Sequence, residues 1–150
     1  MDLYRMAKRE FIGDLTGGGA GTAGGRWNEK GAGVIIASES LALAALELLV
    51  HVPLSLLPGD ICVATIRVPD RIRPEGLPGS FLPPGWRVYP APAELAEIGS
   101  NWAAEGASLL LKVPSAVTER EFNFLINPHH PDMMDVRIID IEDFRPGGRY

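Results

Sequence analysis

The sequence predicts an α+β (mixed α/β) fold in a single domain spanning residues 1–150. Three observations lead to this class. The chain has the usual size of one domain, and it is 46% hydrophobic and 22% charged, as ordinary globular proteins are. Several short segments have the pattern of strands, and a few have that of helices. Strands and helices do not alternate regularly, which argues against a doubly wound sheet.

The first half of the chain combines strands with one long glycine-rich loop. In order, it predicts a strand at 2–6, the loop at 13–33, a buried strand at 33–38 (GVIIAS) and a helix from there to about His51. Glycine is unfavourable inside helices and strands, so residues 13–33 are expected to form a shaped loop. Ser38 or Ser40 supplies the N-cap of the helix, and Pro53 closes it off.

The second half predicts further strands around one irregular excursion. In order, it predicts a strand at 61–69 (ICVATIRVP), an ordered surface loop at 70–92, a helix at 92–106, strands at 108–115 (SLLLKVPS) and 122–127 (FNFLIN), and a last strand at 134–144 (MDVRIIDIEDF). The run at 61–69 is rich in β-branched residues, which favour strands. Residues 70–92 are interrupted by prolines at 74, 78, 83, 84, 90 and 92.

Composition and charge exclude several function classes. The formal net charge is −5, and lysine and arginine are scattered, so no nucleic-acid partner is expected. No apolar run is long enough to span a bilayer, and the N-terminus lacks the apolar region of a secretory signal, so we expect a cytoplasmic protein without membrane contact. The single Cys62 lies in an apolar run, where a buried, inert thiol is expected rather than a reactive one.

The glycine-rich loop contains a G-x-G-x-x-G sequence at 19–24, the pattern of a dinucleotide-binding turn. That turn needs an apolar strand before it and a helix after it, and neither is predicted here. A Rossmann site is therefore not predicted. The loop leads into Arg26-Trp27-Asn28, where Arg26 either binds an anion close to bare backbone or is a structural arginine packed against Trp27.

Glu47 is the only charged residue between Glu39 and His51, on an otherwise apolar helix. Partial burial of a carboxylate requires a partner. Glu47 therefore either pairs with His51 or a distant arginine, or it is an acid held in a cleft. The strand at 33–38 connects the glycine-rich loop to this helix and could bring Arg26 and Glu47 to one pocket.

A third group of polar residues follows the predicted strand at 108–115. Ser115 is either a turn or cap device or part of a site, and it is not in a G-x-S-x-G context, so a hydrolase nucleophile is unsupported. His129 and His130 are adjacent and have no spaced ligand partners, so no metal site is predicted. Asn127 begins a rigid turn with polar side chains available to a site.

Three separated elements occur together: GGRWN, then SLALAALE, then a tryptophan-containing helix followed by LLKVPSAV and NFLINPHHP. Together they resemble the RES domain, which is named for an Arg, a Glu and a Ser and is the toxin half of bacterial toxin–antitoxin pairs. The resemblance runs from Tyr4-Arg5 to the strand after NPHHPD, which is essentially the whole chain.

The resemblance implies a fold like that of diphtheria-toxin-type ADP-ribosyltransferases, with NAD as the substrate and no metal. It places Arg26, Glu47 and Ser115 at the three name positions, as catalytic residues. It implies that NAD is bound by the following residues: Arg5, Arg26, Trp27, Asn28, Ser38 and Asn127. In this interpretation Arg5 and Arg26 hold the pyrophosphate, and Ser115 and Asn127 orient the ribose or the nicotinamide amide.

The family resemblance also predicts the reaction and the partners. The nicotinamide–ribose bond of NAD is cleaved, and ADP-ribose passes to water, phosphate or a protein side chain. A cognate Xre-like antitoxin is the expected partner, and a homodimer is compatible with the sequence. One position departs from the family, because Ile36 stands where a tyrosine is common; Trp27 or Tyr4 could take over its role, or the chain could be a catalytically impaired module that only binds its antitoxin.

Overall fold

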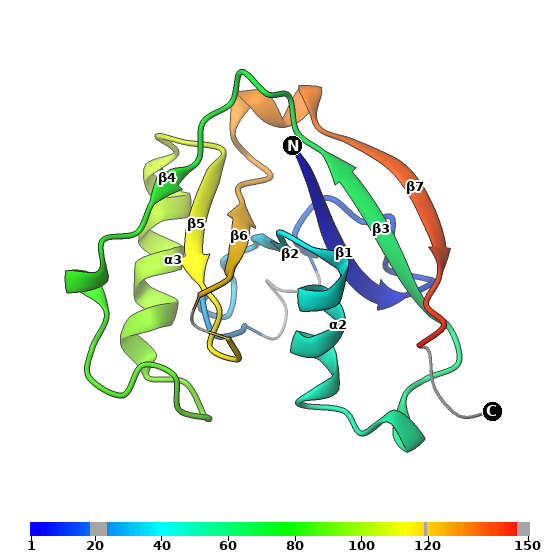
Figure 1. Cartoon of the computed structure of the whole chain (residues 1–150). Helices are drawn as coiled ribbons and strands as arrows, with labels where there is room; N and C mark the ends of the chain where they lie inside the picture. Colours follow the sequence, from blue (N-terminus) through cyan, green and yellow to red (C-terminus); the bar gives the residue numbers. More distant parts are fainter. Residues whose placement is uncertain (19–23, 119, 147–150) are drawn as a thin grey trace.

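A computed structural model of the chain describes residues 1–18, 24–118 and 120–146. Figure 1 gives its element labels. The strands are β1 (Asp2–Lys8), β2 (Ile35–Ser38), β3 (Ile61–Arg67), β4 (Glu75–Gly76), β5 (Leu110–Pro114), β6 (Phe122–Ile126) and β7 (Arg137–Asp143). The helices are α2 (Leu41–Leu49) and α3 (Ala93–Glu105), and the short 3₁₀ turns are η1 (Leu54–Leu56), η2 (Gly79–Phe81) and η3 (Pro131–Asp135).

The strands form one sheet in the order β4-β5-β6-β2-β1-β3-β7. The β4–β5 pair is parallel and the other pairs are antiparallel. Figure 1 shows β1, β3 and β7 on one side of the molecule and β4, β5 and β6 on the other, with β2 between them. The two sides meet where β1 and β2 are paired at a single position, Tyr4 opposite Ser38. The sheet is therefore open on one side of that pair.

Helix α2 lies beside this opening, and α3 lies farther away, next to β4 and β5 (Figure 1). Ser40 is the N-cap of α2, because its Oγ accepts a hydrogen bond from the Leu43 backbone N–H at 3.0 Å. The helix packs against β1 and β2 with Leu43 and Ala44 buried. Helix α3 ends at Gly106, whose φ of 67° is the left-handed conformation that favours glycine at a helix C-terminus.

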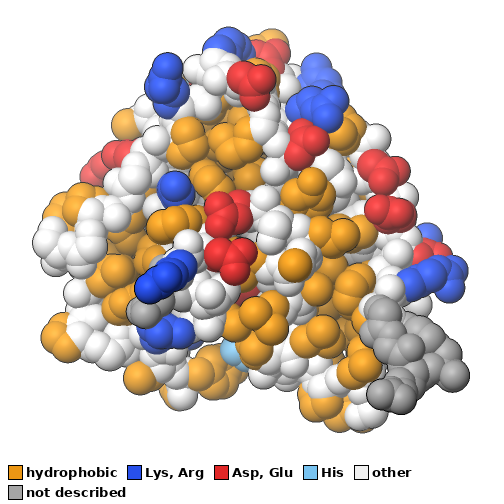
Figure 2. Space-filling view, in the orientation of Figure 1, with side chains coloured by type: hydrophobic (Ala, Val, Ile, Leu, Met, Phe, Trp, Pro, Cys, Tyr) orange, Lys and Arg blue, Asp and Glu red, His pale blue; other side chains and the backbone are white. Residues whose placement is uncertain are grey.

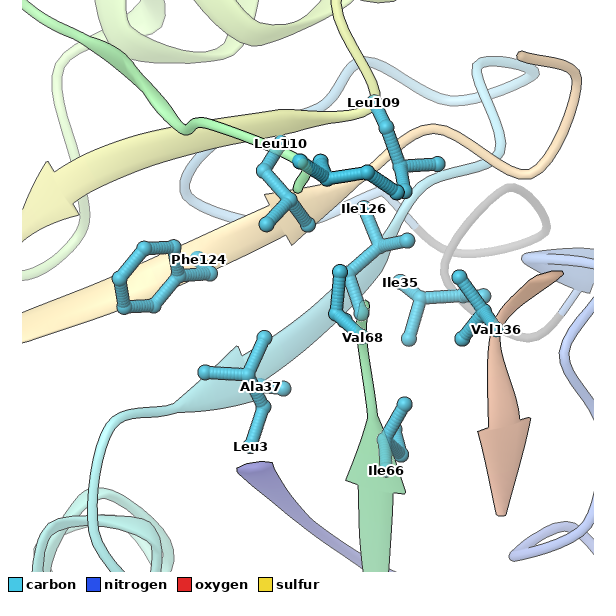
Figure 3. Packing of buried hydrophobic residues seen from close by; sticks show 11 residues of the cluster. Leu3, Ile35, Ala37, Ile66, Val68, Leu109, Leu110, Phe124, Ile126 and Val136 are labelled. Carbon is cyan, nitrogen blue, oxygen red and sulfur yellow. The ribbon is translucent and has the colours of Figure 1, made fainter. Parts of the chain in front are cut away.

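The buried residues form two main clusters, one on each face of the central strands. Figure 3 shows the first, where Ile35 and Ala37 of β2 meet Leu3, Ile66 and Phe124 from neighbouring strands. The second lies under α3 and is made of Trp27, Val34, Leu95, Trp102, Leu111, Val113 and Leu125. Alternate residues of β2 thus face alternate clusters, as the two-residue period of a strand requires.

The α+β class is confirmed, and most element positions follow the sequence prediction. The proline-rich segment 70–92 is irregular apart from β4 and η2. The predicted strand at 134–144 was wrong at its start, because η3 occupies residues up to Asp135 and β7 begins at Arg137. Pro131 at the start of η3 sets the φ of a helical turn, and this local preference overrides the apolar pattern. No helix in the described ranges is both long and apolar enough to cross a membrane.

Candidate functional site

Three polar side chains lie in a row across the centre of the sheet. Ser38 of β2 is directly opposite Asn123 of β6 on one side and Tyr4 of β1 on the other. Residues directly opposite each other in antiparallel strands point to the same face. The Ser38 hydroxyl donates to Asn123 Oδ1 at 2.7 Å, and both side chains are buried. This bond fixes which end of the Asn123 amide carries its N–H donors.

Glu47 of α2 meets this row. Asn123 Nδ2 donates to Glu47 Oε1 at 2.7 Å, and Ser115 Oγ donates to the same oxygen at 2.6 Å. These are the short distances of hydrogen bonds to a charged acceptor. Because both bonds end on Oε1, the second carboxylate oxygen, Oε2, remains available to a ligand. The structure thus brings Glu47 together with Ser115 and Asn123, and these two donors are the partners of the carboxylate among the described residues.

Ser115 lies behind Glu47 rather than on an open surface. The residue is 0% exposed, and its Oγ accepts hydrogen bonds from the backbone N–H groups of Val117 and Thr118 at 3.0 and 3.2 Å. The hydroxyl therefore donates its one proton to Glu47 and accepts with both lone pairs. Its position next to the sheet is set by β5, which ends one residue earlier at Pro114.

A cavity of about 200 Å³ opens beside Glu47, where β1 and β2 separate. Glu47, Arg5, Ser38 and Asn123 line it together with Tyr4 and Ile36. A smaller hollow of about 150 Å³ continues from it past Arg5 and Ile36 to Asp14 and Gly17. Glu47 and Arg5 thus both line this cavity. Ile36, the position where the family resemblance implies a tyrosine, is part of its wall.

Arg5 is held in place by the turn after β1. Its guanidinium donates to the carbonyl oxygens of Phe11 at 3.2 Å and Ile12 at 2.9 Å. Burial lowers the pKa of Arg5, and the nearby Asp14 carboxylate opposes that shift. An arginine remains protonated under such a shift, so Arg5 brings a partly desolvated positive charge to the cavity wall.

Arg26 is positioned by the proline-rich segment. Its guanidinium donates to the carbonyl oxygen of Trp86 at 2.8 Å and to that of Val88 at 3.1 Å. Burial lowers the pKa of Arg26, and the Glu47 carboxylate opposes that shift. Arg26 is not among the residues that line the Glu47 cavity. Two carbonyl contacts leave further N–H groups of the guanidinium for a ligand.

Residues 86–89, whose carbonyl oxygens bind Arg26, also contact the segment after Ser115 and the residues that follow α2. Arg87 donates to the carbonyl oxygens of Ala116 and Val117, at 3.1 and 3.3 Å. The Tyr89 ring lies 5.0 Å from that of His51, at the C-terminal end of α2. Residues 86–89 thus touch the Arg26 loop, the Ser115 segment and the Glu47 helix. His51 contacts this tyrosine ring and not the Glu47 carboxylate.

Trp27 and Asn28 are not brought to the cavity. Trp27 is 3% exposed and packs in the cluster under α3, and Asn28 is buried with its Nδ2 donating to the Ala32 carbonyl at 2.9 Å. A Cβ at Gly99 of α3 would lie 1.6 Å from the Trp27 carbonyl oxygen, so only glycine allows this approach. Helix α3 therefore fixes the backbone that carries Arg26.

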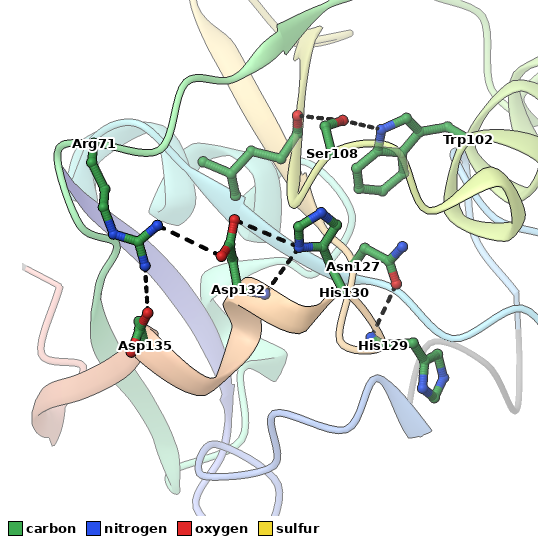
Figure 4. Close-up of polar contacts among 9 residues, drawn as sticks. Arg71, Trp102, Ser108, Asn127, His129, His130, Asp132 and Asp135 are labelled. Carbon is green, nitrogen blue, oxygen red and sulfur yellow. Dashed lines mark hydrogen bonds and ion pairs between the residues drawn. The ribbon is translucent and has the colours of Figure 1, made fainter.

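Asn127 and the two histidines lie just before η3 (Figure 4), and none of the three lines the Glu47 cavity. Asn127 donates to the Ala103 carbonyl at 3.0 Å and accepts from the His129 N–H at 3.1 Å. His130 Nδ1 accepts from the Asp132 N–H at 3.0 Å, as a helix cap does. These contacts give the three residues a local structural role, and no group of three metal-binding side chains was found in the described ranges.

Two further sequence predictions concern residues outside this site. Cys62 is buried, as predicted, and lies on β3. Most of the G-x-G-x-x-G sequence falls in residues 19–23, which lie outside the described residues. Of its glycines, Gly24 is described and has a φ of 74°, a left-handed conformation.

Sequence reasoning missed Asn123 and the Trp86 and Val88 carbonyls. Asn123 had a signal, because it is the only polar residue in the strand FNFLI. A polar side chain at a buried strand position needs a partner. The two carbonyls had none, since a backbone acceptor does not depend on the side chain that the sequence specifies.

Comparison with known proteins places this geometry in a family. The fold is similar to that of a solved M. tuberculosis structure described as the MbcT–MbcA toxin–antitoxin complex, with a TM-score of 0.70, 17% identity and coverage of 95% of this chain and 83% of that chain. The model of the RES domain family matches residues 2–146. The chain therefore belongs to the RES domain family.

Relatives at higher identity carry related names. A Sphingobium protein named "Prs ADP-ribosylating toxin" is 42% identical over 127 residues, covering 83% of this chain and 78% of the relative. A Yersinia enterocolitica protein named "Toxin Res" is 38% identical over 135 residues, covering 87% of this chain and 86% of the relative. A Pseudomonas putida protein of the same name is 36% identical over 152 residues, covering 99% of each chain.

Proposed function

We propose that the chain is the toxin of a bacterial toxin–antitoxin pair that cleaves the nicotinamide–ribose bond of NAD and transfers ADP-ribose to an acceptor. The names of the relatives support the toxin assignment and the ADP-ribosylating class. The observation that carries the proposal is the Glu47 carboxylate, which two buried donors hold by one oxygen beside a cavity that it shares with Arg5.

The chemistry of the bond explains why one fixed carboxylate suffices. When the ribose C1–N bond of NAD breaks, the electron pair leaves with nicotinamide, which becomes a neutral ring, and the ribose acquires oxocarbenium character. A carboxylate placed beside C1 and the ribose hydroxyls stabilises charge that develops only in the transition state. Glu47 Oε2 would supply this stabilisation. No general acid is required, because the leaving group needs no proton.

The remaining site residues would bind and orient. Arg5 and Arg26 would hold the pyrophosphate, since guanidinium groups form paired hydrogen bonds with phosphate oxygens. The geometry favours a positioning role for Ser115 through Glu47, because its hydroxyl is buried and fully engaged. Ser38 would act in the same way through Asn123. Tyr4, which lines the cavity with Ile36, is the better replacement for the absent family tyrosine than the buried Trp27.

The acceptor and the partners are the finer part of the proposal. A nucleophile on the acceptor attacks ribose C1 and loses its proton, which completes the transfer. The name of the Sphingobium relative indicates a protein acceptor, Prs, and we propose a protein acceptor here as well. A cognate Xre-like antitoxin would hold the toxin inactive in the cytoplasm. The solved structure with this fold is itself a toxin–antitoxin complex.

Product analysis tests the function directly. NAD would be incubated with purified, antitoxin-free protein in phosphate buffer, in phosphate-free buffer and with Prs, and the products identified by mass spectrometry. Free nicotinamide is expected in all three, with ADP-ribose passing slowly to water in the two buffers and to Prs in the third. ADP-ribose 1″-phosphate or free ADP-ribose as the main product when Prs is present would instead name phosphate or water as the acceptor.

Ile36 provides the specific alternative. If the missing tyrosine disabled the site, the chain would act only by binding its antitoxin. Intact NAD in all three incubations, from a protein that is folded by circular dichroism, would favour that binding module over the enzyme.

A further inference from the structure

A second hollow, of about 530 Å³, borders the candidate site without being part of it. Its lining includes Leu77, Leu82, Trp86, Lys112, Arg120 and Phe122. Two segments are shared with the site. Trp86 lines the hollow, and its carbonyl oxygen accepts a hydrogen bond from Arg26. Pro114 also lines the hollow, and the next residue, Ser115, donates to Glu47.

The hollow combines positive charge with aromatic surface. Lys112 Nζ lies 4.2 Å from the centre of the Phe122 ring, in a cation–π contact. Figure 2 shows Lys and Arg side chains beside hydrophobic and acidic ones on the surface over β5, β6 and the hairpin that joins them. Within the described part of the chain, neither Lys112 nor Arg120 has a carboxylate partner within ion-pair distance, although the chain carries a net charge of −5. By contrast, Arg9, Arg67 and Arg71 all pair with aspartates.

The proline-rich segment that contributes to the hollow also carries exposed apolar side chains. Phe81 of η2 is 62% exposed, and Val88 and Tyr89 at the end of the same segment are 54% and 78% exposed. Exposed apolar side chains are common at interaction sites, and aromatic and arginine side chains are enriched there. An open hollow of about 530 Å³ lined by aromatic side chains fits a polypeptide segment, and its two cations without a described carboxylate partner fit an acidic one.

We propose that this hollow docks an acidic segment of the protein acceptor, with an aromatic or aliphatic side chain between Trp86 and Phe122 and carboxylates on Lys112 and Arg120. This inference rests on the proposed function, because it assigns the surface that would hold the acceptor next to the Glu47 cavity. A segment bound there would contact Pro114, the residue before Ser115. It would also contact Trp86, whose carbonyl oxygen binds Arg26.

The test is a titration of ¹⁵N-labelled protein, followed by NMR, with a short synthetic peptide of alternating glutamate and tyrosine. We expect the indole N–H signal of Trp86 to shift, while those of Trp27 and Trp102, which are 3% and 6% exposed, stay in place. The double variant Lys112→Glu, Arg120→Glu should bind the peptide about tenfold more weakly or worse. The matched control is Arg137→Glu on β7, an exposed cation at the opposite edge of the sheet, which should bind as the wild type does.

Several results would overturn the docking site. They are an absence of shifts, shifts centred on Arg5 and the Glu47 cavity, or equal affinity of the double variant. Equal binding of a glutamine–tyrosine peptide would refute recognition by charge. Binding of adenosine monophosphate at Trp86 with the affinity of the peptide would assign the hollow to small anions instead.

The titration uses no NAD, so its failure and the failure of the proposed function are distinguishable. In the activity assay, the double variant should release nicotinamide in the absence of Prs at a rate within about twofold of the wild type, but with Prs present it should modify Prs at about one tenth of the wild-type rate. Peptide binding by a wild type that leaves NAD intact would overturn the proposed function and not the peptide site. Equal modification of Prs by wild type and double variant would overturn the docking site alone.

Discussion

Replacing Ser115 with alanine separates a positioning role from substrate contact. The hydroxyl donates to Glu47 Oε1 at 2.6 Å, and the residue is 0% exposed. The substitution removes one of the two donors that orient the carboxylate and leaves Asn123 as the other. It also removes the acceptor of the Val117 and Thr118 N–H groups. We therefore expect turnover to fall while affinity for NAD is kept.

The structure sets the size of both effects. A hydrogen bond to a charged group contributes about 1.5–3 kcal/mol, and the two lost backbone contacts are only partly buried, so Ser115→Ala should lower the free energy of unfolding by about 2 kcal/mol. Removing a residue that orients a functional group costs about 10–100-fold in activity. We expect a decrease of that size in kcat, with KM for NAD within about twofold of the wild type.

The assay is steady-state release of nicotinamide over a range of NAD concentrations, with Ser108→Ala as the control. Ser108 is also partly buried and bonded to two side chains, Trp102 and Glu75, at 2.8 Å each (Figure 4). Its alanine variant should lose stability and keep kcat. If Ser115→Ala instead raised KM and left kcat unchanged, Ser115 would contact NAD directly, and the positioning role would be wrong.

Three further substitutions test other parts of the site. Gly99→Ala gains about 1 kcal/mol of helix propensity, but it drives a Cβ into the Trp27 carbonyl at an overpacking cost of up to about 3 kcal/mol. We therefore expect Tm to fall. A higher Tm in calorimetry would refute the close approach. Ile36→Tyr places a ring in the Glu47 cavity and should lower KM for NAD about fivefold. An unchanged KM would show that position 36 does not face the ligand. In Arg26→Lys, the single ammonium group cannot reach two carbonyls and a phosphate, so NAD should bind about tenfold more weakly by titration calorimetry. Equal affinity would exclude Arg26 from the pyrophosphate site.

The sequence predicted those elements whose pattern reflects local burial. The run ICVATIRVP and the helix after Ser40 follow this rule, because alternation and capping residues act within a few neighbours. The start of β7 was placed too early, since Pro131 and the cap at His130 favoured a 3₁₀ turn over the strand. Strand β4 has two residues, too few to carry a period.

The candidate site was predictable where chemistry lies in a side chain. Glu47 stood out as a lone carboxylate on an apolar helix, and the structure places it, with Arg5, on one cavity. Contacts between segments far apart in the sequence were not predictable. The Trp86 carbonyl meets Arg26 across 60 positions, and the glycine at 99 looks unfavourable until the Trp27 backbone is seen against it.

The central claim is that the Glu47 carboxylate promotes cleavage of the nicotinamide–ribose bond. The most direct measurement is the rate of nicotinamide release by wild type and Glu47→Gln under saturating NAD, with thermal unfolding of both proteins as the check on folding. The glutamine keeps the size and one acceptor oxygen but lacks the charge, so we predict a loss of about 10²–10³-fold in kcat with Tm nearly unchanged. Nicotinamide release at the wild-type rate by folded Glu47→Gln would contradict the account.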